Sequence, residues 1–260
     1  MTGLPADAAQ WRSRRHRLHE RSLAAVAVTV ALAVAMTLCL GVGAASANDS
    51  GWKRVLSEDG INVAAREIPD NPNLEFRGVG VIQANIFQLL AIIDDSSRHC
   101  EWQANCIVSK VVKSVGEFER YIYHRVDSPW PVSDRDVVVH GTVEANIEAR
   151  TVVSRFRAVQ LAGHPPVSGV VRMPTLSGFY KFEALTDTST RVTYQVVADT
   201  GGLLPAWLSN RAARKLPLGT LLGMRRQAKR MEGRYAAFHA RFNPAFGGRL
   251  VEPQALPKAR

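Results

Sequence analysis

Arg135 and Asp136 are neighbours within the run Ser128–Val138, which reads SPWPVSDRDVV. Two roles are open for this pair. The side chains could form a structural ion pair or hydrogen bonds at the start of a strand. Alternatively, Arg135 could bind an anion such as phosphate, because a guanidinium group forms strong charge-assisted hydrogen bonds with oxyanions. The second role makes Arg135 a candidate ligand-binding residue.

Cys100 and Cys106 form a second pair with defined chemistry. A disulfide between them would close a short loop and contribute about 2 kcal/mol in the chain-entropy model. Two buried free thiols fit the sequence equally well. A zinc site that includes His99 is disfavoured, because no second ligand pair of recognisable spacing follows. The sequence therefore predicts no metal and no cofactor.

Motifs of catalysis are absent from the sequence. It contains no G-x-S-x-G, H-E-x-x-H, P-loop or dinucleotide-binding pattern. Asp94 and Asp95 fall at the end of an expected helix and indicate an ordinary helix terminus. His140 stands alone, and a lone histidine is more often a core residue than a ligand. We therefore expect a protein that is not an enzyme.

A sheet must position these side chains, because most of the chain alternates between polar and apolar residues with a period of two. Short turns separate the alternating segments, which favours antiparallel pairing of neighbours. Short helices are expected at Asn48–Leu56 and at Ile86–Asp94, the second capped by Asn85. About eight strands are expected, at Ile61–Ile68, Leu74–Gln83, Ile107–Val115, Glu117–Val126, Asp136–Ala145, Thr151–Gln160, Gly178–Ala184 and Arg191–Ala198.

The last two expected strands indicate which side chains face the interior. Tyr180 and Phe182 alternate with Lys181 and Glu183, and the next strand repeats this pattern. Successive side chains of a strand point to opposite faces, so the aromatic residues share the inward face. They could line a cavity or simply fill a core.

The longest helical run in the sequence is Leu203–Phe242. From Leu221 onward, apolar side chains recur every three or four residues and predict a face that packs on the sheet. Pro217 cannot donate a helical hydrogen bond, so we expect a break between Ala213 and Leu218. One long helix against a large curved antiparallel sheet is an α+β architecture.

The first 47 residues have the pattern of a secretory signal peptide. Arginines from Arg12 to Arg21 precede an uncharged apolar run, Leu23–Leu40, and small residues follow up to Ala47. An uncleaved anchor over residues 23–43 is the alternative, because about 20 apolar residues can span a bilayer. The protein is therefore expected to be exported to the periplasm or anchored in the inner membrane.

The chain is basic, with 33 Lys and Arg against 23 Asp and Glu. Residues 1–47 hold five of the basic and two of the acidic side chains, so 28 against 21 remain without them, a net charge of +7. Such a charge fits either nucleic acid or an anionic membrane. No nucleic-acid recognition motif is present, so we expect no nucleic-acid partner. Arg211, Arg214 and Lys215 are candidate contacts for an anionic membrane surface.

Four segments together resemble the START domain, the lipid-transfer module related to the steroidogenic acute regulatory protein, in its bacterial exported form. They are Ser128–Val138, Asp199–Asn210 (DTGGLLPAWLSN), Cys100–Cys106 around Trp102, and His164–Met173 (HPPVSGVVRM). The resemblance covers roughly Trp52–Arg230. It implies a helix-grip fold, in which a curved antiparallel sheet and the last helix enclose a hydrophobic tunnel. The sequence departs from sterol-binding relatives at Gly141, where their tunnel carries part of a polar pair.

The resemblance implies that residues 48–242 bind and transfer one lipid or other hydrophobic molecule, with a flexible tail at 243–260. Arg135 would then contact a headgroup phosphate, and Gly201–Gly202 and His164–Pro166 are candidate gates. The expected partners are this lipid and, transiently, an anionic membrane, and the expected state is a monomer. A polyketide cyclase or aromatase on the same fold is the alternative. Candidate residues at the tunnel wall or mouth are Trp130, Arg135, Val138, Phe156, Tyr180, Phe182, Tyr194, Val196, Trp207 and Leu221.

Overall fold

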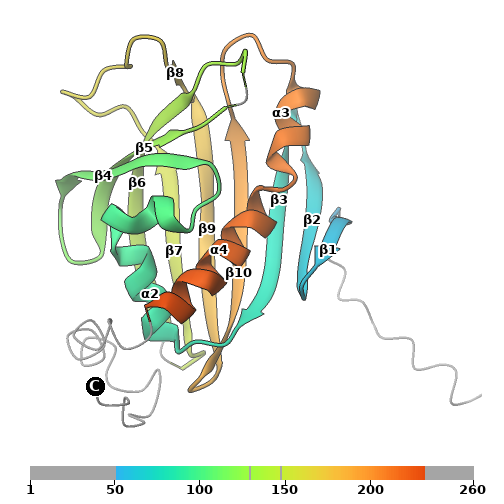
Figure 1. Ribbon diagram of the computed structural model, residues 1–260, viewed down its shortest axis with the longest axis vertical. Coiled ribbons are helices and arrows are strands. Elements are labelled where there is room, and N and C mark those ends of the chain that lie inside the picture. The colour runs from blue at the N-terminus through green and yellow to red at the C-terminus, as the bar shows by residue number, and fades with distance from the viewer. Residues whose placement is uncertain (1–50, 129, 147, 232–260) are drawn as a thin grey trace, which may run out of the picture. The chain divides into compact units, whose positions relative to one another are not determined.

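The computed structural model describes residues 51–231, except residues 129 and 147. Within this range the chain forms one large curved sheet with helices on its inner face (Figure 1). The strands are β1 (Lys53–Glu58), β2 (Ile61–Ile68), β3 (Asn71–Ile82), β4 (Cys106–Ser114), β5 (Glu119–Val126), β6 (Arg135–Asn146), β7 (Thr151–Ala158), β8 (Val171–Arg172), β9 (Thr175–Thr186) and β10 (Ser189–Asp199). The helices are α2 (Ile86–Asp94), the 3₁₀ helix η2 (Ser96–Glu101), α3 (Ala206–Ala213) and α4 (Leu216–Arg230).

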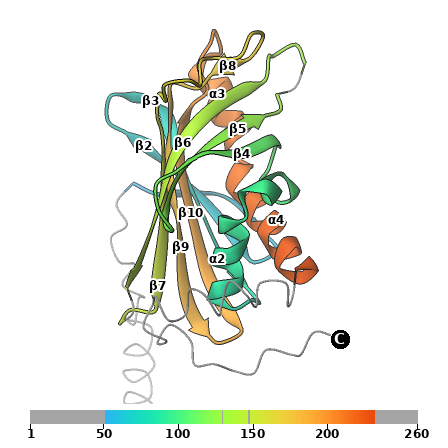
Figure 2. The ribbon, with the colours of Figure 1, turned by 90° about the vertical axis from the view of Figure 1, so that its left-hand side faces the viewer.

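The strand order is β1-β2-β3-β10-β9-β7-β6-β5-β4, and every neighbouring pair in this order is antiparallel. The two-residue strand β8 pairs with β6 in parallel. Figure 2 shows the curvature of the sheet, with α2 and α4 on the same side of it. This arrangement is the expected α+β, helix-grip architecture, and the sheet stays open between β1 and β4.

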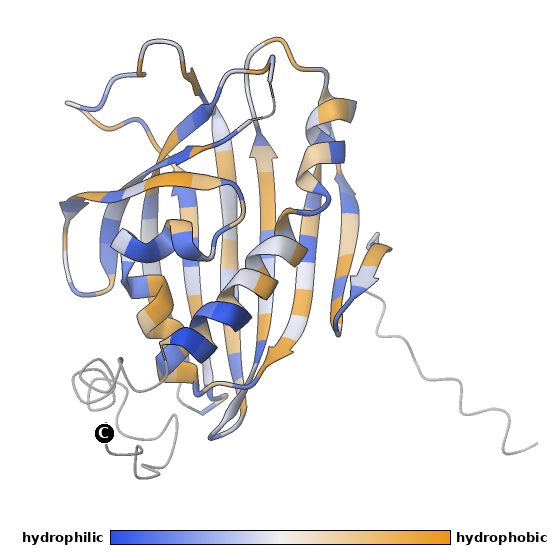
Figure 3. Ribbon diagram, viewed as in Figure 1, coloured by the Kyte–Doolittle hydropathy of each residue, from blue (hydrophilic) through white to orange (hydrophobic). Residues whose placement is uncertain are grey.

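The strands form where the sequence alternates. Figure 3 shows hydrophobic and hydrophilic residues alternating along most of them. Helix α2 begins as predicted, because the side chain of Asn85 accepts a hydrogen bond from the backbone N–H of Phe87 at 2.8 Å. The hairpin of β2 and β3 and the strands β4 to β7, β9 and β10 also confirm the predictions, with bounds that shift by a few residues.

The expected helix at Asn48–Leu56 is wrong, because Lys53–Glu58 is strand β1 and pairs with β2. A helix this short is unstable by itself, whereas the sheet edge supplies backbone hydrogen bonds. Trp52 fixes the start of the strand, since the guanidinium carbons of Arg66 and Arg77 lie 4.7 and 4.2 Å from its ring centre. The short strand β8 was also not predicted.

The break in the C-terminal helix is confirmed. Helix α3 ends at Ala213 and α4 begins at Leu216. Pro217 lies in the first turn of α4, where its missing N–H would have no helical partner in any case. The predicted continuation of this helix over residues 232–242, the predicted tail at 243–260 and the predicted signal peptide lie outside the described residues. Within residues 51–231, no helix is sufficiently long and apolar to span a bilayer.

The main core lies between the sheet and the helices α2 and α4. Phe76, Phe182, Leu221 and Met224 are among its buried side chains. Helix α4 rests directly on the loop after η2, because a Cβ atom at Gly223 would lie only 1.9 Å from the carbonyl oxygen of Trp102. Glycine at this position therefore sets the separation between α4 and that loop.

Candidate functional site

A cavity of about 470 Å³ lies beside this core. Its walls are the inward faces of β5, β6 and β7, the end of α2, the loop 103–105, and the segment from Thr200 to Thr220 that includes α3. Most of the lining is apolar. Apolar lining residues include Leu90, Ile93, Phe118, Ile122, Val126, Val132, Val137, Val139, Val143, Met173, Leu176, Ala198, Leu204, Leu208 and Leu216.

Arg135 lines the cavity and is 4% exposed. Its Nε donates to the carbonyl oxygen of Thr200 at 3.4 Å, and its Nη1 donates to the carbonyl oxygen of Ser133. No carboxylate within the described residues forms an ion pair with it. Burial lowers the pKa of the guanidinium group, and the charge of Asp134 opposes this effect. Arg135 thus places a positive charge in the cavity wall without an ion-pair partner.

The ion pair between Arg135 and Asp136 is not formed. Adjacent strand residues face opposite sides of the sheet, so Asp136 points away from the cavity and is 0% exposed. Arg172 binds its carboxylate with two hydrogen bonds, Nε to Oδ1 at 2.7 Å and Nη2 to Oδ2 at 3.1 Å. Arg172 also donates to the carbonyl oxygens of His164 and Pro165. The candidate gate at His164–Pro166 is thereby attached to the outer face of β6, and none of its residues lines the cavity.

Two buried histidines form part of the cavity wall. The rings of His99 and His124 are parallel, with an interplanar angle of 2° and centroids 5.5 Å apart. Nε2 of His99 donates to the carbonyl oxygen of Ile93 at 2.7 Å. Burial lowers the pKa of His99 to about 4 and, together with the neighbouring His99, lowers the pKa of His124 to about 3. Both imidazoles are therefore neutral near pH 7.

Tyr180 of β9 and Tyr194 of β10 line the cavity together with the valines of β6. Their rings stack with centroids 4.4 Å apart, and their hydroxyl groups hydrogen-bond to each other. Burial raises the pKa of both phenols, so they remain protonated. Trp102 contacts Tyr180 in a T-shaped arrangement, and its indole nitrogen has no hydrogen-bond partner among the described residues. The tyrosines thus satisfy each other and leave their rings as an apolar wall.

A charged pair lies at another part of the lining. Arg120 donates to the carboxylate and to the backbone carbonyl of Asp94, and both residues line the cavity. Arg120 pairs across the sheet with Gly141, the position at which the sequence departs from sterol-binding relatives. Its charge is compensated by Asp94, in contrast to that of Arg135.

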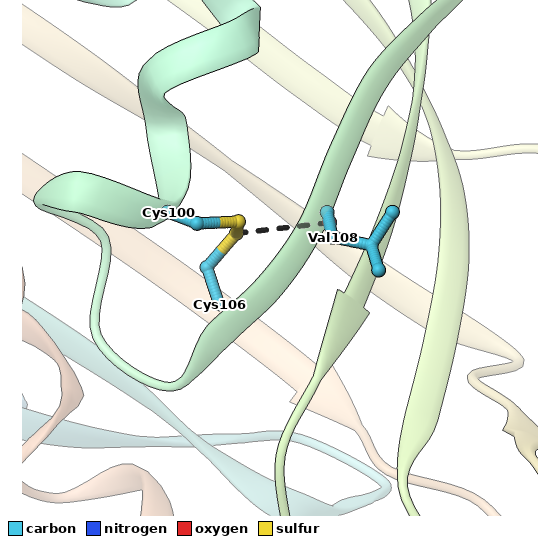
Figure 4. The surroundings of a disulfide bond; sticks show 3 residues. All are labelled: Cys100, Cys106 and Val108. Carbon is cyan, nitrogen blue, oxygen red and sulfur yellow. Dashed lines mark hydrogen bonds between the residues drawn. A yellow bond between two sulfur atoms is a disulfide. The ribbon is translucent and has the colours of Figure 1, made fainter.

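Cys100 and Cys106 form a disulfide, shown in Figure 4. The carbonyl oxygen of Val108 lies 3.7 Å from Sγ of Cys106. The disulfide joins η2 to β4 and closes the loop that carries Trp102. Since this loop contacts α4 at Gly223, the disulfide holds one wall of the cavity against the helix.

The structure brings half of the predicted tunnel residues to the cavity. Trp130, Arg135, Phe156, Tyr180 and Tyr194 line it, with Trp130 93% exposed at the rim. The other predicted residues lie elsewhere. Val138 faces the outer side of β6, and Phe182, Val196 and Leu221 are packed in the core.

Trp207 does not line the cavity. It is 67% exposed and contributes instead to a separate surface groove between α3 and strands β1 to β3. The groove is lined by Val55, Ala65, Leu74, Phe76, Trp207, Asn210, Arg211 and Arg214. Helix α3 faces the cavity with Leu208 and Ala212, and Trp207 lies on another face of the same helix.

His99 and His124 were missed by the sequence reasoning. A signal for His124 exists in β5, because Tyr121, Tyr123 and Arg125 alternate with Ile122, His124 and Val126. One histidine on an otherwise apolar inward face marks a polar position within the interior. No group of three or more metal-ligating side chains occurs in the part of the chain that the structure describes.

Comparison with known proteins gives consistent matches. The model of the START domain family matches residues 35–232. An uncharacterized protein of Pseudomonas aeruginosa is 35% identical over 187 residues, which cover 72% of this chain and 91% of that protein. The STAR-related lipid transfer protein (fragment 25–204) from Xanthomonas axonopodis has 31% identity and a TM-score of 0.64, covering 69% of this chain and 99% of that structure. The phosphatidylcholine transfer protein of Rattus norvegicus is 24% identical over 166 residues, 63% of this chain and 77% of that protein.

Proposed function

Because the chain belongs to the START domain family, we propose that it binds one lipid in its cavity and transfers it within the cell envelope, without catalysis. The observation that carries the proposal is the apolar cavity of about 470 Å³, into which one uncompensated guanidinium group projects. Ligand pockets for small molecules commonly have volumes of about 300 to 1,000 Å³. The cavity is therefore of a size to enclose much of one amphiphile.

The free-energy cost of an empty cavity favours a bound apolar molecule. At about 24 cal/mol per Å³, an empty apolar void of this volume would cost about 11 kcal/mol. This cost is similar to the whole stability of a typical domain. A lipid tail offsets it, and each methylene that leaves water contributes about 0.8 kcal/mol. The protein should therefore bind a lipid with its tail inside the cavity.

Arg135 favours a lipid with an anionic group. A buried charge is costly unless an opposite charge and hydrogen bonds compensate it. Two carbonyl oxygens contact Arg135, whereas its charge has no ion-pair partner within the described residues. A phosphate or carboxylate of a lipid would supply both. The similarity to the phosphatidylcholine transfer protein of Rattus norvegicus, whose name indicates a phosphate-containing lipid, agrees with this choice.

Exposed apolar side chains support transient contact with an anionic membrane. Trp130, Leu203 and Trp207 are 93%, 102% and 67% exposed. Tryptophan is favoured at the boundary between lipid and water, because its ring is apolar and its N–H is polar. Arg211 and Arg214 lie beside Trp207 and add about 1 kcal/mol each near an anionic surface. Export of the chain, as its first 47 residues predict, would bring this surface to the membranes of the envelope.

Native mass spectrometry of the protein purified from its own envelope tests the proposal. We expect one co-purifying lipid per chain, and Arg135→Gln should reduce the share of anionic lipid. Val138→Ala, on the outer face of the same strand, is the control for loss of packing. A protein that binds no lipid in these experiments contradicts the proposal. Turnover of an aromatic polyketide by the purified protein would instead support the cyclase alternative.

A further inference from the structure

His124 is a second polar position in the cavity wall, separate from Arg135. It lies on β5, is 9% exposed and lines the cavity. Its ring contacts that of His99 and has no hydrogen-bond partner within the described residues. Nδ1 of His99 is a fully buried atom without a hydrogen-bond partner among the described residues. Neither ring nitrogen of His124 is fully buried in this way. The nitrogens of His124 therefore open on the cavity.

The ring of His124 is positioned by its contact with His99. His99 is fixed by its hydrogen bond to the carbonyl oxygen of Ile93 and stacks parallel to His124. Burial keeps the pKa of both rings far below neutrality. A neutral imidazole carries one N–H donor and one bare nitrogen acceptor. His124 thus presents an uncharged donor and acceptor and lacks the positive charge with which Arg135 attracts an anion.

The strand register fixes the distance between the two polar positions. His124 pairs with Val137 across the sheet, and Arg135 pairs with Val126. His124 and Arg135 are therefore diagonal neighbours on one face, with roughly 7 to 8 Å between their Cα atoms. A molecule that reaches both side chains must have a charged group and a neutral polar group only a few bonds apart.

We propose that His124 binds a neutral oxygen of the lipid, a hydroxyl or an ester carbonyl, while Arg135 binds the adjacent anionic group. This inference rests on the proposed function and names its ligand class. Glycerophospholipids and their lyso forms fit, because the glycerol esters or hydroxyl lie a few bonds from the phosphate. A simple fatty acid has the anion without the second group, and a sterol has a hydroxyl without the anion.

Neighbouring polar side chains favour His124 for this role. The hydroxyl groups of Tyr180 and Tyr194 already bond to each other. Arg120 is engaged by Asp94. A lipid oxygen that lies against these groups must compete with an existing contact, whereas His124 has its bonding capacity unused. An unpaired polar group in an apolar site is unfavourable, so the ligand gains by satisfying it.

The test rests on two lipids that differ only in the neutral group, the diacyl form and its dialkyl ether analogue. The purified full-length chain is titrated with dipalmitoyl phosphatidic acid, its lyso form, the dialkyl ether analogue without carbonyl groups, and palmitate. We expect the diacyl form to bind about tenfold more tightly than the dialkyl ether, the ratio that one well-made hydrogen bond supplies. In His124→Phe this ratio should fall to about one, while affinity for palmitate stays within twofold of that of the unmodified protein.

Two further variants separate the subsite from general damage. His140→Phe is the matched control, because His140 lies on the outer face of β6, where its Nε2 contacts Glu119 at 2.7 Å, and should keep the tenfold ratio. His124→Gln retains a donor and an acceptor and should recover part of it. If His124→Phe does not fold, the ¹⁵N shifts of the His124 ring in the unmodified chain decide. They should move on addition of the diacyl lipid and not of the ether.

The possible failures are distinguishable. Equal binding of diacyl and dialkyl lipids by the unmodified chain, or an unchanged ratio in His124→Phe, overturns the subsite and leaves the proposed function intact. Binding of neither phosphatidic acid nor palmitate contradicts the proposed function itself.

Discussion

The inner face of the sheet is packed solid around β3 and the hairpin ends of β9 and β10, and it encloses a cavity along β5, β6 and the opposite ends of β9 and β10. On the first side, Phe76, Phe182 and Val192 are 3%, 0% and 0% exposed and belong to the main core. On the second side, Val137 and Val139 belong to a small cluster that borders the cavity. Both sides come from strands with the same alternation, so alternation alone does not decide which side is filled.

The difference has a physical cause in the distance to the helices. Helix α4 lies directly on β3 and β10, and a Cβ atom at Gly78 would lie 2.7 Å from Cβ of Pro217. Large side chains close the remaining space there. Across β5 and β6 the covering elements are the end of α2, the loop 103–105 and the segment from Thr200 to Thr220, and the apolar residues that β6 contributes are only valines and Gly141. The solid side can thus supply the stability that the hollow side lacks.

Phe182→Ala should produce the largest effect. Removal of this fully buried ring leaves a void in a rigid core and is expected to cost about 3 to 5 kcal/mol. Ile122→Ala is the matched variant on the hollow side, and it should cost less because Ile122 already borders the cavity. Denaturant unfolding of both variants measures the two values. Equal losses would contradict the division into a solid and a hollow side.

Acid should destabilise the hollow side specifically. His99 and His124 have pKa values of about 4 and 3 in the folded chain, below the ordinary value of 6.5. The unfolded chain therefore takes up more protons as the pH falls below 6.5, and stability is lost until the folded values are reached. Between pH 7 and 5, each histidine should lower the unfolding free energy by about 2 kcal/mol.

Charged groups near the two histidines shift the pKa of His99 in both directions. Asp95 raises the pKa of His99, while Arg120 lowers it. His124→Phe should remove about half of the dependence on pH, as measured by unfolding at pH 5, 6 and 7. If this variant loses as much stability in acid as the unmodified protein, the buried pair is not the source.

Cleavage of the disulfide should have an intermediate effect. The loop between Cys100 and Cys106 is short, so Cys100→Ser with Cys106→Ser should cost about 2 kcal/mol. Because the loop carries Trp102 and contacts α4 at Gly223, lipid affinity should also fall. Unfolding and lipid titration of the double variant, beside the unmodified chain with and without reductant, provide the measurement. Unchanged stability after reduction would show that packing alone holds the loop.

The sequence predicts the sheet and the broken helix, because alternation and a proline act locally. It also predicts the inward face of Tyr180 and Phe182. It does not predict that the cavity reaches Tyr180 and stops before Phe182, since that boundary depends on the position of α4. The partner of Asp136 is also unpredictable from local sequence, because Arg172 lies 36 residues away along the chain.

The smallest expected change in stability comes from a larger side chain at Val139, and the same change at the adjacent Val138 provides the contrast. Val138 is 0% exposed on the packed outer face, so Val138→Phe should cost about 1 to 3 kcal/mol through overpacking. Val139 faces the cavity, where space for a ring exists, so Val139→Phe should leave the unfolding free energy within about 0.5 kcal/mol. The same ring should weaken lipid binding at least tenfold, because it occupies the volume of the tail. Calorimetric unfolding and lipid titration of the two variants should therefore give opposite results, and a Val139→Phe protein that binds lipid normally would contradict the assignment of this cavity as the lipid site.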